Sequence, residues 1–265
     1  MRDPANARSF LFVPATRPER ISKAFASGAD AVIVDLVDAV APADKEAARA
    51  GLLAALAADA GVLVRINAAG TPWHDGDMDC LDHPGIAGVM LAKAETAGDI
   101  ARMPKPVIPL IETARGLAAA RTIAEVAGVV RLAFGTIDFM LDLGLPEDAE
   151  AMAIYRAELA LASRLAGLAP AIDGVTPAID DVDRVIAETR RALAFGFGAR
   201  LCIHPAQIGP VHDTMRPGDD AIHRARRIVA AAEAAGGGAI QLDGAMLDRP
   251  LVAQAEALLA RAGEQ

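Results

Sequence analysis

Eight short apolar segments alternate with stretches of helical periodicity between residues 9 and 203. Each segment is too short for a helix and almost continuously apolar, which is typical of parallel strands that are covered on both faces. The expected strands are Ser9–Pro14, Ala31–Asp35, Val62–Asn67, Gly88–Ala92, Val107–Ile111, Val130–Phe134, Pro170–Gly174 and Ala199–Ile203. Strand and helix units repeated in this way predict a closed α/β barrel, the (β/α)8 or TIM barrel.

An open doubly wound sheet is the alternative architecture for such an alternation. No GxGxxG follows the first expected strand, and no GxxxxGK[ST] occurs in the chain. The usual sequence reasons to prefer an open nucleotide-binding sheet are therefore absent. The longer helices are expected at Arg17–Ser27, Asp44–Ala58, Ala114–Val126, Ala149–Leu165 and Asp180–Ala194.

The pattern changes after His204. A linker signal precedes a helical stretch, three glycines, a short hairpin-like piece and a last helix, at Arg216–Asp220, Ala221–Ala235, Gly236–Gly238, Ala239–Leu247 and Pro250–Ala262. We therefore expect a catalytic barrel domain over residues 1–215 and a C-terminal segment over residues 216–265. A closed barrel has no place for a ninth unit, so this segment is either a lid over the barrel mouth or an arm onto a neighbouring subunit.

Composition excludes several classes of function. The chain has 265 residues, a net charge of −9 and only 3% aromatic residues, which argues against nucleic acid or an anionic membrane surface as a partner. Cys80 and Cys202 lie far apart and show no disulfide or metal-binding spacing. No signal peptide and no apolar run of about 18 residues is found. We expect a cytoplasmic protein.

Two carboxylates, Glu112 and Asp138, follow expected strands within a few residues of their ends. The carboxyl ends of parallel strands meet at one edge, where α/β proteins bind ligands, so the two side chains should converge. Two oxygen ligands with room for water and a substrate oxygen describe a Mg²⁺ site. The alternative is that each residue only caps the helix that follows it.

Other polar residues stand at the strand ends and form an expected active-site rim: Asp35, Asp38, Arg65, Asn67, Lys93, Glu95, Asp173 and His204. Each could instead belong to a structural ion pair. Arg65 lies inside the apolar run VRIN, and a guanidinium beside a metal is suited to hold a substrate carboxylate. Lys93 could form a Schiff base, although two acidic ligands favour a metal-assisted reaction.

Several motifs, in order along nearly the whole chain, resemble the citrate lyase beta-subunit-like branch of the HpcH/HpaI aldolase family, to which malyl-CoA and citramalyl-CoA lyases are related. They are Arg8-Ser9-x-Leu11-Phe12-Val13-Pro14, Ala29-Asp30-x-Val32-Ile33-x-Asp35-Leu36-x-Asp38, Val64-Arg65-Ile66-Asn67, Pro109-Leu110-Ile111-Glu112-Thr113, Phe134-Gly135-Thr136-x-Asp138 and Ile203-His204-Pro205-x-Gln207. The resemblance implies a Mg²⁺-dependent carbon–carbon lyase with a TIM barrel, commonly a trimer and so a homo-oligomer, either trimer or hexamer.

The resemblance also implies a reaction and its residues. Such an enzyme splits or forms a 3-hydroxyacyl thioester, such as malyl-CoA, citramalyl-CoA or a citryl thioester, into an acyl-CoA or related thioester and a 2-oxo acid. By the same resemblance Glu112 and Asp138 bind Mg²⁺ and Arg65 binds the oxo acid. The backbone around Gly135, Thr136 and Ile137, up to Asp138, lies near that ligand.

The tail motif Leu242-Asp243-Gly244-x-Met246-x-Asp248-x-Pro250 resembles the C-terminal lid of this family, whose acidic residue, here Asp248, reaches the site of an adjacent subunit. The chain departs from the family pattern at Ala15, Val37 and Ala92, and Val37 replaces a glutamate. Val37 is the best argument for one alternative, a non-catalytic thioester-binding or complex-forming subunit. A CoA-independent pyruvate-type aldolase is a second alternative.

Overall fold

The computed structural model describes residues 2–148, 150–234, 240–243 and 245–263. By its internal contacts the chain divides into two compact units, residues 1–212 and 213–265. The glycine break expected at Gly236–Gly238 lies outside the described residues. Within the described ranges, every helix is too short or too polar to span a bilayer.

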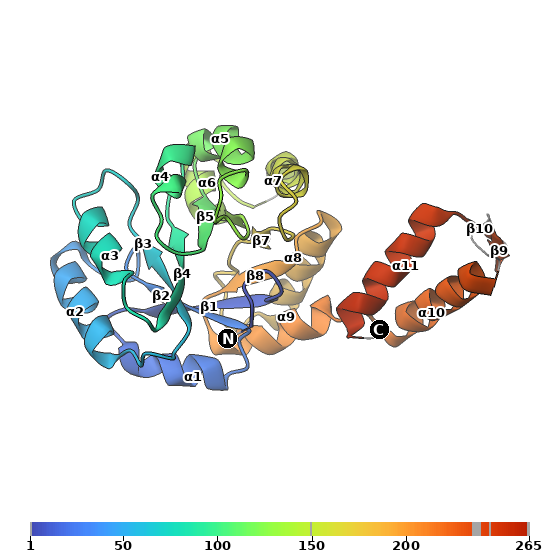
Figure 1. The fold of residues 1–265 in the computed structure, drawn as a ribbon, viewed down its shortest axis with the longest axis horizontal. Coiled ribbons are helices and arrows are strands. Elements are labelled where there is room, and N and C mark those ends of the chain that lie inside the picture. Colours follow the sequence, from blue (N-terminus) through green and yellow to red (C-terminus); the bar gives the residue numbers. More distant parts are fainter. Residues whose placement is uncertain (1, 149, 235–239, 244, 264–265) are drawn as a thin grey trace. The chain divides into compact units, whose positions relative to one another are not determined.

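The first unit is a closed barrel of eight parallel strands surrounded by helices (Figure 1). The strands follow one another around the barrel in chain order, and β1 pairs with both β2 and β8, which closes it. Their bounds are β1 Ser9–Pro14, β2 Ala31–Asp35, β3 Val62–Ile66, β4 Ile86–Leu91, β5 Val107–Ile111, β6 Ala133–Phe134, β7 Ile172–Asp173 and β8 Ala199–Cys202. The predicted TIM-barrel fold is confirmed.

The helices around the barrel connect successive strands. They are α1 Ile21–Ala26, α2 Lys45–Ala55, α3 His74–Cys80, α4 Ala97–Ala101, α5 Ala114–Ala124, α6 Thr136–Leu143, α7 Ala153–Leu165 and α8 Val182–Ala194, followed by α9 Ile208–Met215. Side-chain caps fix where several of them begin, because the first helical N–H groups need acceptors. Thr113 accepts from Gly116 N at the start of α5, and Asp181 accepts from Arg184 N at the start of α8.

Small and branched side chains fill the barrel interior. Phe10, Ile33, Leu63, Ile108 and Leu201 belong to one buried cluster that takes residues from all eight strands. Aromatic residues are scarce, so alanines such as Ala31, Ala133 and Ala199 complete this core. Close packing of this kind holds the strand ends rigidly and therefore fixes the polar side chains that follow them.

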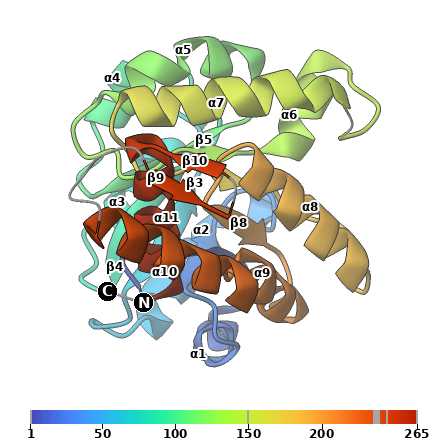
Figure 2. The ribbon, with the colours of Figure 1, turned by 90° about the vertical axis from the view of Figure 1, so that its right-hand side faces the viewer.

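The second unit is a helical hairpin with a small β-hairpin at one end (Figure 2). It consists of α10 Asp219–Ala234, β9 Ile240–Leu242, β10 Ala245–Leu247 and α11 Arg249–Ala262, with α10 packed on α11 and β9 antiparallel to β10. Arg227 Nη2 lies 2.6 Å from Asp243 Oδ1 and ties α10 to the turn of the hairpin. The expected helices and hairpin are present, whereas a lid or arm role for this unit stays a prediction.

Candidate active site

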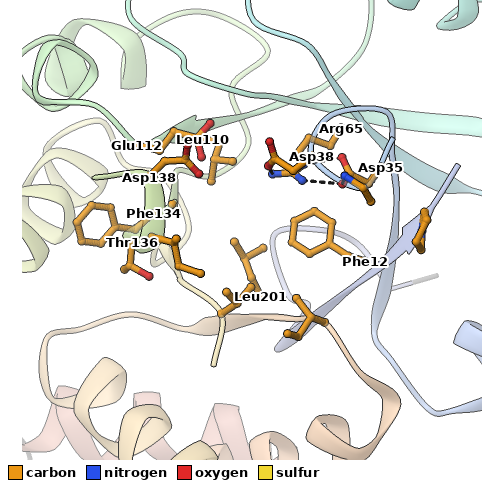
Figure 3. A pocket seen from close by; sticks show the side chains of 16 residues that line it. Phe12, Asp35, Asp38, Arg65, Leu110, Glu112, Phe134, Thr136, Asp138 and Leu201 are labelled. Carbon is orange, nitrogen blue, oxygen red and sulfur yellow. Dashed lines mark hydrogen bonds and ion pairs between the residues drawn. The ribbon is translucent and has the colours of Figure 1, made fainter. Parts of the chain in front are cut away.

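A cavity of about 490 Å³ opens at the carboxyl ends of the barrel strands. Asp35, Asp38, Arg65, Glu112 and Asp138 supply its charged lining (Figure 3). Phe12, Leu110, Phe134, Val175 and Leu201 form apolar walls beneath and beside them. The expected rim therefore includes a pocket in which acidic and basic groups share one partly apolar environment.

Glu112 follows β5 directly and is held in place by backbone on both sides. Its Oε1 accepts a hydrogen bond from Lys93 N at 2.8 Å, and the side chain is buried. On the other side it packs on Gly135, where a Cβ would lie 2.5 Å from Glu112 Cβ. Thr113, rather than Glu112, caps α5. The helix-cap alternative for Glu112 is therefore wrong.

Asp138 lies in the first turn of α6, beside Glu112 at the pocket wall (Figure 3). Burial, followed by the negative charge of Asp138, raises the pKa of Glu112 to about 8. Arg65 and the hydrogen bond from Lys93 lower this pKa but do not cancel the rise. Two carboxylates in this arrangement repel each other, so a cation between them would be stabilising.

The two carboxylates fit a divalent metal ion. No group of three or more His, Cys, Asp or Glu side chains suited to a metal occurs among the described residues. A metal at Glu112 and Asp138 would therefore lack a third His, Cys, Asp or Glu ligand among these residues, and water or substrate oxygens can complete its coordination. Mg²⁺ commonly binds through one or two carboxylates and keeps several waters, so this donor set fits that ion.

Arg65 in β3 faces the pocket from the opposite wall. Its Nε donates to Asp35 Oδ1 at 2.7 Å, its Nη2 donates to Asp35 Oδ2 at 2.6 Å, and its Nη1 lies 2.9 Å from Asp38 Oδ2. Burial alone would lower the pKa of Arg65, but these acidic partners raise it above its ordinary value, so the guanidinium is always charged. It also lies over the Phe12 ring, with Cζ 4.8 Å from the centroid.

The start of α6 contributes backbone to the pocket. Gly135, Thr136 and Ile137 all line the cavity, and Gly135 is the N-cap of the helix. Gly135 N donates to Ile111 O at 2.9 Å and is thereby part of the barrel, so it is not available for a ligand. The N–H groups of the first helical turn have no acceptors within a helix and favour an anion there.

Three residues expected at the rim have structural roles instead. Asp173 is fully buried and binds Arg156 Nε and Arg200 Nη1, at 3.1 and 3.0 Å, so it is the centre of a buried ion-pair group and does not line the cavity. His204 caps the turn Pro205–Gln207 and is exposed. Asn67 accepts from Lys45 Nζ and donates to Asp77.

Lys93 and Glu95 both follow β4 but differ in what they contact. Glu95 Oε1 accepts from Thr113 Oγ1 at 2.8 Å, outside the residues that line the cavity. Lys93 Nζ lies 3.3 Å from Asp138 Oδ1. Burial lowers the pKa of Lys93, but Asp138 outweighs this and raises it. A Schiff-base lysine requires a lowered pKa, so this environment does not favour that role.

Asp248 belongs to the second unit and is the N-cap of α11. Its Oδ1 accepts from Leu251 N at 3.3 Å, and Pro250 occupies the first turn. The capping role is thus observed, while its expected approach to a barrel mouth stays a prediction.

The sequence is similar to proteins of a known family. Residues 8–205 match the family model described as HpcH/HpaI aldolase/citrate lyase. The chain belongs to this family. It is 40% identical, over 96% of its length and 95% of the relative's, to the citrate lyase subunit beta-like protein of Mycobacterium tuberculosis strain H37Rv. It is 30% identical to the L-malyl-CoA/beta-methylmalyl-CoA lyase of Cereibacter sphaeroides, over 96% and 94% of the two lengths.

One solved structure matches nearly the whole chain. The crystal structure of protein CitE from M. tuberculosis in complex with magnesium, acetoacetate and coenzyme A has a TM-score of 0.90 and 38% identity, and covers 98% of this chain and 100% of that one. The predicted family and its carbon–carbon lyase class are therefore confirmed, and magnesium is the metal of this structural relative.

Sequence reasoning gave Asp35 and Asp38 no role beyond a place at the rim. In the structure they hold Arg65 from two sides and line the cavity. The sequence does contain a signal for this role. Asp35 ends β2 and Asp38 follows it, and Asp35 is the register partner of Arg65 in the neighbouring strand β3.

Proposed function

We propose that this protein is a Mg²⁺-dependent lyase that splits or forms a 3-hydroxyacyl-CoA thioester, with an acyl-CoA and a 2-oxo acid on the other side of the reaction. The observation that carries the proposal is that one pocket combines a candidate metal site with a fixed cation that can bind an anionic substrate. Glu112 and Asp138 offer a cation site on one wall, and Arg65 offers a fixed positive charge on the other.

Glu112 and Asp138 would hold the metal. Bound there, Mg²⁺ supplies Lewis-acid stabilisation of negative charge on a substrate oxygen. The chain's own contribution is to fix the two carboxylates, through Lys93 N and the close contact with Gly135. The magnesium ion and the 2-oxo acids or acetoacetate in structures of M. tuberculosis relatives support this assignment.

Arg65 and the start of α6 would bind the oxo acid. Each Nη of Arg65 carries a second hydrogen beyond those committed to Asp35 and Asp38, so the end of the guanidinium can still donate to a carboxylate or carbonyl. The first-turn N–H groups at Thr136 and Ile137 would donate from the other side. Asp35 prevents the guanidinium from turning away, which keeps the two donors pre-organised.

The reaction breaks the bond between the carbon that bears the hydroxyl and the carbon next to the thioester. The hydroxyl proton passes to solvent water, the oxygen becomes the carbonyl of the 2-oxo acid, and the bonding electrons move into an enolate of the acyl thioester. A proton delivered to that enolate completes the acyl-CoA, and its removal begins the reverse reaction. We assign this transfer to Asp248, from an adjacent copy in a trimer or hexamer, as general acid–base catalyst.

Purified full-length protein would be incubated with MgCl2 and, separately, with malyl-CoA, citramalyl-CoA and a free 4-hydroxy-2-oxo acid. We expect release of glyoxylate or pyruvate from at least one CoA thioester, and loss of this activity in Glu112→Gln. Cleavage of the free acid alone would establish the CoA-independent aldolase instead. No turnover of any compound, with thioester binding intact, would establish the non-catalytic subunit.

A further inference from the structure

Lys93 contacts both of the candidate metal ligands. Its backbone N–H donates to Glu112 Oε1 at 2.8 Å, and its side-chain Nζ lies 3.3 Å from Asp138 Oδ1. The carboxylates come from two different parts of the barrel, after β5 and in α6. A single residue after β4 therefore connects the two halves of the proposed metal site.

The backbone of Lys93 is in an uncommon conformation. Its φ is 46°, in the left-handed region, where glycine is unstrained and a long side chain is not. This turn directs the Lys93 N–H at Glu112, and a glycine would serve that purpose at lower conformational cost. Strain in a residue that contacts both Glu112 and Asp138 indicates that its side chain has a use of its own.

The charges around Asp138 indicate what that use is. Arg65, a cation that lines the cavity, is already paired with Asp35 and Asp38. Among the residues that the structure describes, Lys93 supplies the cation that pairs with Asp138. The Lys93 ammonium therefore pairs with the Asp138 carboxylate, which would also be a metal ligand.

We propose that the Lys93 ammonium is an internal counter-cation of the metal site, which holds Asp138 before metal binds and competes with the divalent ion for that carboxylate. The inference rests on the proposed Mg²⁺ site at Glu112 and Asp138. Two cations on one carboxylate repel each other, so the ammonium must move away or weaken metal binding. Its side chain is 49% exposed on a flexible stem, so it can move into water.

The test is a titration of the full-length, EDTA-treated protein with MgCl2 in a calorimeter. Lys93→Met removes the charge and keeps a side chain at the same backbone position, and we expect its Kd for Mg²⁺ to fall about three- to tenfold. Lys93→Arg keeps the charge and should stay close to wild type. Lys105→Met is the matched control, because Lys105 precedes β5 at the opposite end of the barrel from Glu112.

Thermal denaturation supplies a second readout that a merely structural role would not give. Without metal, Lys93→Met should melt below wild type, because Asp138 and Glu112 lose a neighbouring cation. With saturating MgCl2 this deficit should disappear. An unchanged or weaker Mg²⁺ affinity in Lys93→Met, or an equal deficit with and without metal, would overturn the inference. Absence of Mg²⁺ binding in wild type would instead overturn the proposed metal site itself.

Discussion

Gly135 gives Glu112 the space in which its carboxylate lies. A Cβ at position 135 would be 2.5 Å from Glu112 Cβ and closer still to Oε2. The φ of Gly135 is −87°, a value open to any residue, so the glycine is required here by contact and not by backbone conformation. The end of β6 is thus shaped to receive the side chain that follows β5.

Gly135→Ala should displace the Glu112 carboxylate while leaving the barrel folded. We expect Mg²⁺ affinity to fall about tenfold or more, as for losses of groups that orient a metal ligand. Turnover should fall about a hundredfold, as for small misplacements in an active site. Calorimetric titration and steady-state rates measure the two effects.

Gly51→Ala is the matched control for this change. Gly51 lies inside α2, and a Cβ there meets nothing within 4 Å. The substitution should leave metal affinity unchanged and stabilise the helix by up to about 1 kcal/mol. Wild-type Mg²⁺ affinity in Gly135→Ala would show that Glu112 is not a metal ligand.

The barrel was predictable because its signal is local. All eight strands were expected from apolar runs, and β1, β2 and β5 have the predicted bounds. Helix α3 was not among the expected helices, and its sequence HDGDMDC contains a glycine and three acidic residues. It is stabilised by long-range contacts, in which buried Asp77 accepts from Asn67 N and pairs with Arg49, and no local pattern reports them.

The main residues of the candidate site could also be predicted from the sequence. Glu112, Asp138 and Arg65 stand at strand or helix ends, and the barrel brings such ends together, so their convergence followed from the fold. The sequence could not show which of the other charged residues line the cavity and which form buried ion pairs. Asp173 also ends a strand, yet it is buried because Arg156 and Arg200 arrive from α7 and β8 to neutralise it.

Asp148 belongs to the same group of ion pairs and gives a pH-dependent prediction. It accepts from Arg156 Nη1 and Arg191 Nη2, each at 2.7 Å. Burial raises the pKa of Asp148, but the hydrogen bonds and charge of Arg156, with Arg191, outweigh burial and lower it. A lowered carboxyl pKa stabilises the fold above the ordinary value of 3.8, and this stability is lost as pH falls through the folded-state pKa.

Asp148→Asn should therefore lower the free energy of unfolding by about 2 to 4 kcal/mol at pH 7. The difference from wild type should be the same at pH 5 and should shrink below about pH 4, where wild type also loses the charge. Urea denaturation at the three pH values measures it. Asp59→Asn, at an exposed position, is the control. A difference that persists unchanged in acid would mean that Asp148 acts by packing and not by charge.

Arg65→Lys should weaken the binding of the 2-oxo acid without removing the metal. A lysine cannot keep both hydrogen bonds to Asp35 and still present a donor pair to the ligand. We expect a loss of about 2 kcal/mol, or roughly 30-fold in affinity for pyruvate or glyoxylate in the presence of Mg²⁺. Arg49→Lys alters another arginine–aspartate pair, with Asp77, outside the cavity lining and should leave ligand affinity unchanged.

Asp248 is the residue for which a structural and a catalytic role can be separated most cleanly. It caps α11 through Leu251 N, and asparagine caps a helix about as well as aspartate does. Asp248→Asn should therefore keep the stability of α11, while Asp248→Ala should lower it by about 1 kcal/mol. If the carboxylate moves the proton, both variants lose about 10² to 10⁴ in turnover.

Mixed oligomers then show whether Asp248 acts in the site of its own chain or in that of a neighbouring chain. Combining Asp248→Asn chains with Arg65→Lys chains should restore part of the activity, because a sound Asp248 from one chain can meet a sound Arg65 in another. No recovery in oligomers shown by mass spectrometry to be mixed would mean that each chain supplies its own Asp248. Wild-type turnover in Asp248→Asn alone would leave Asp248 with the helix-capping role and assign the proton transfer to another group.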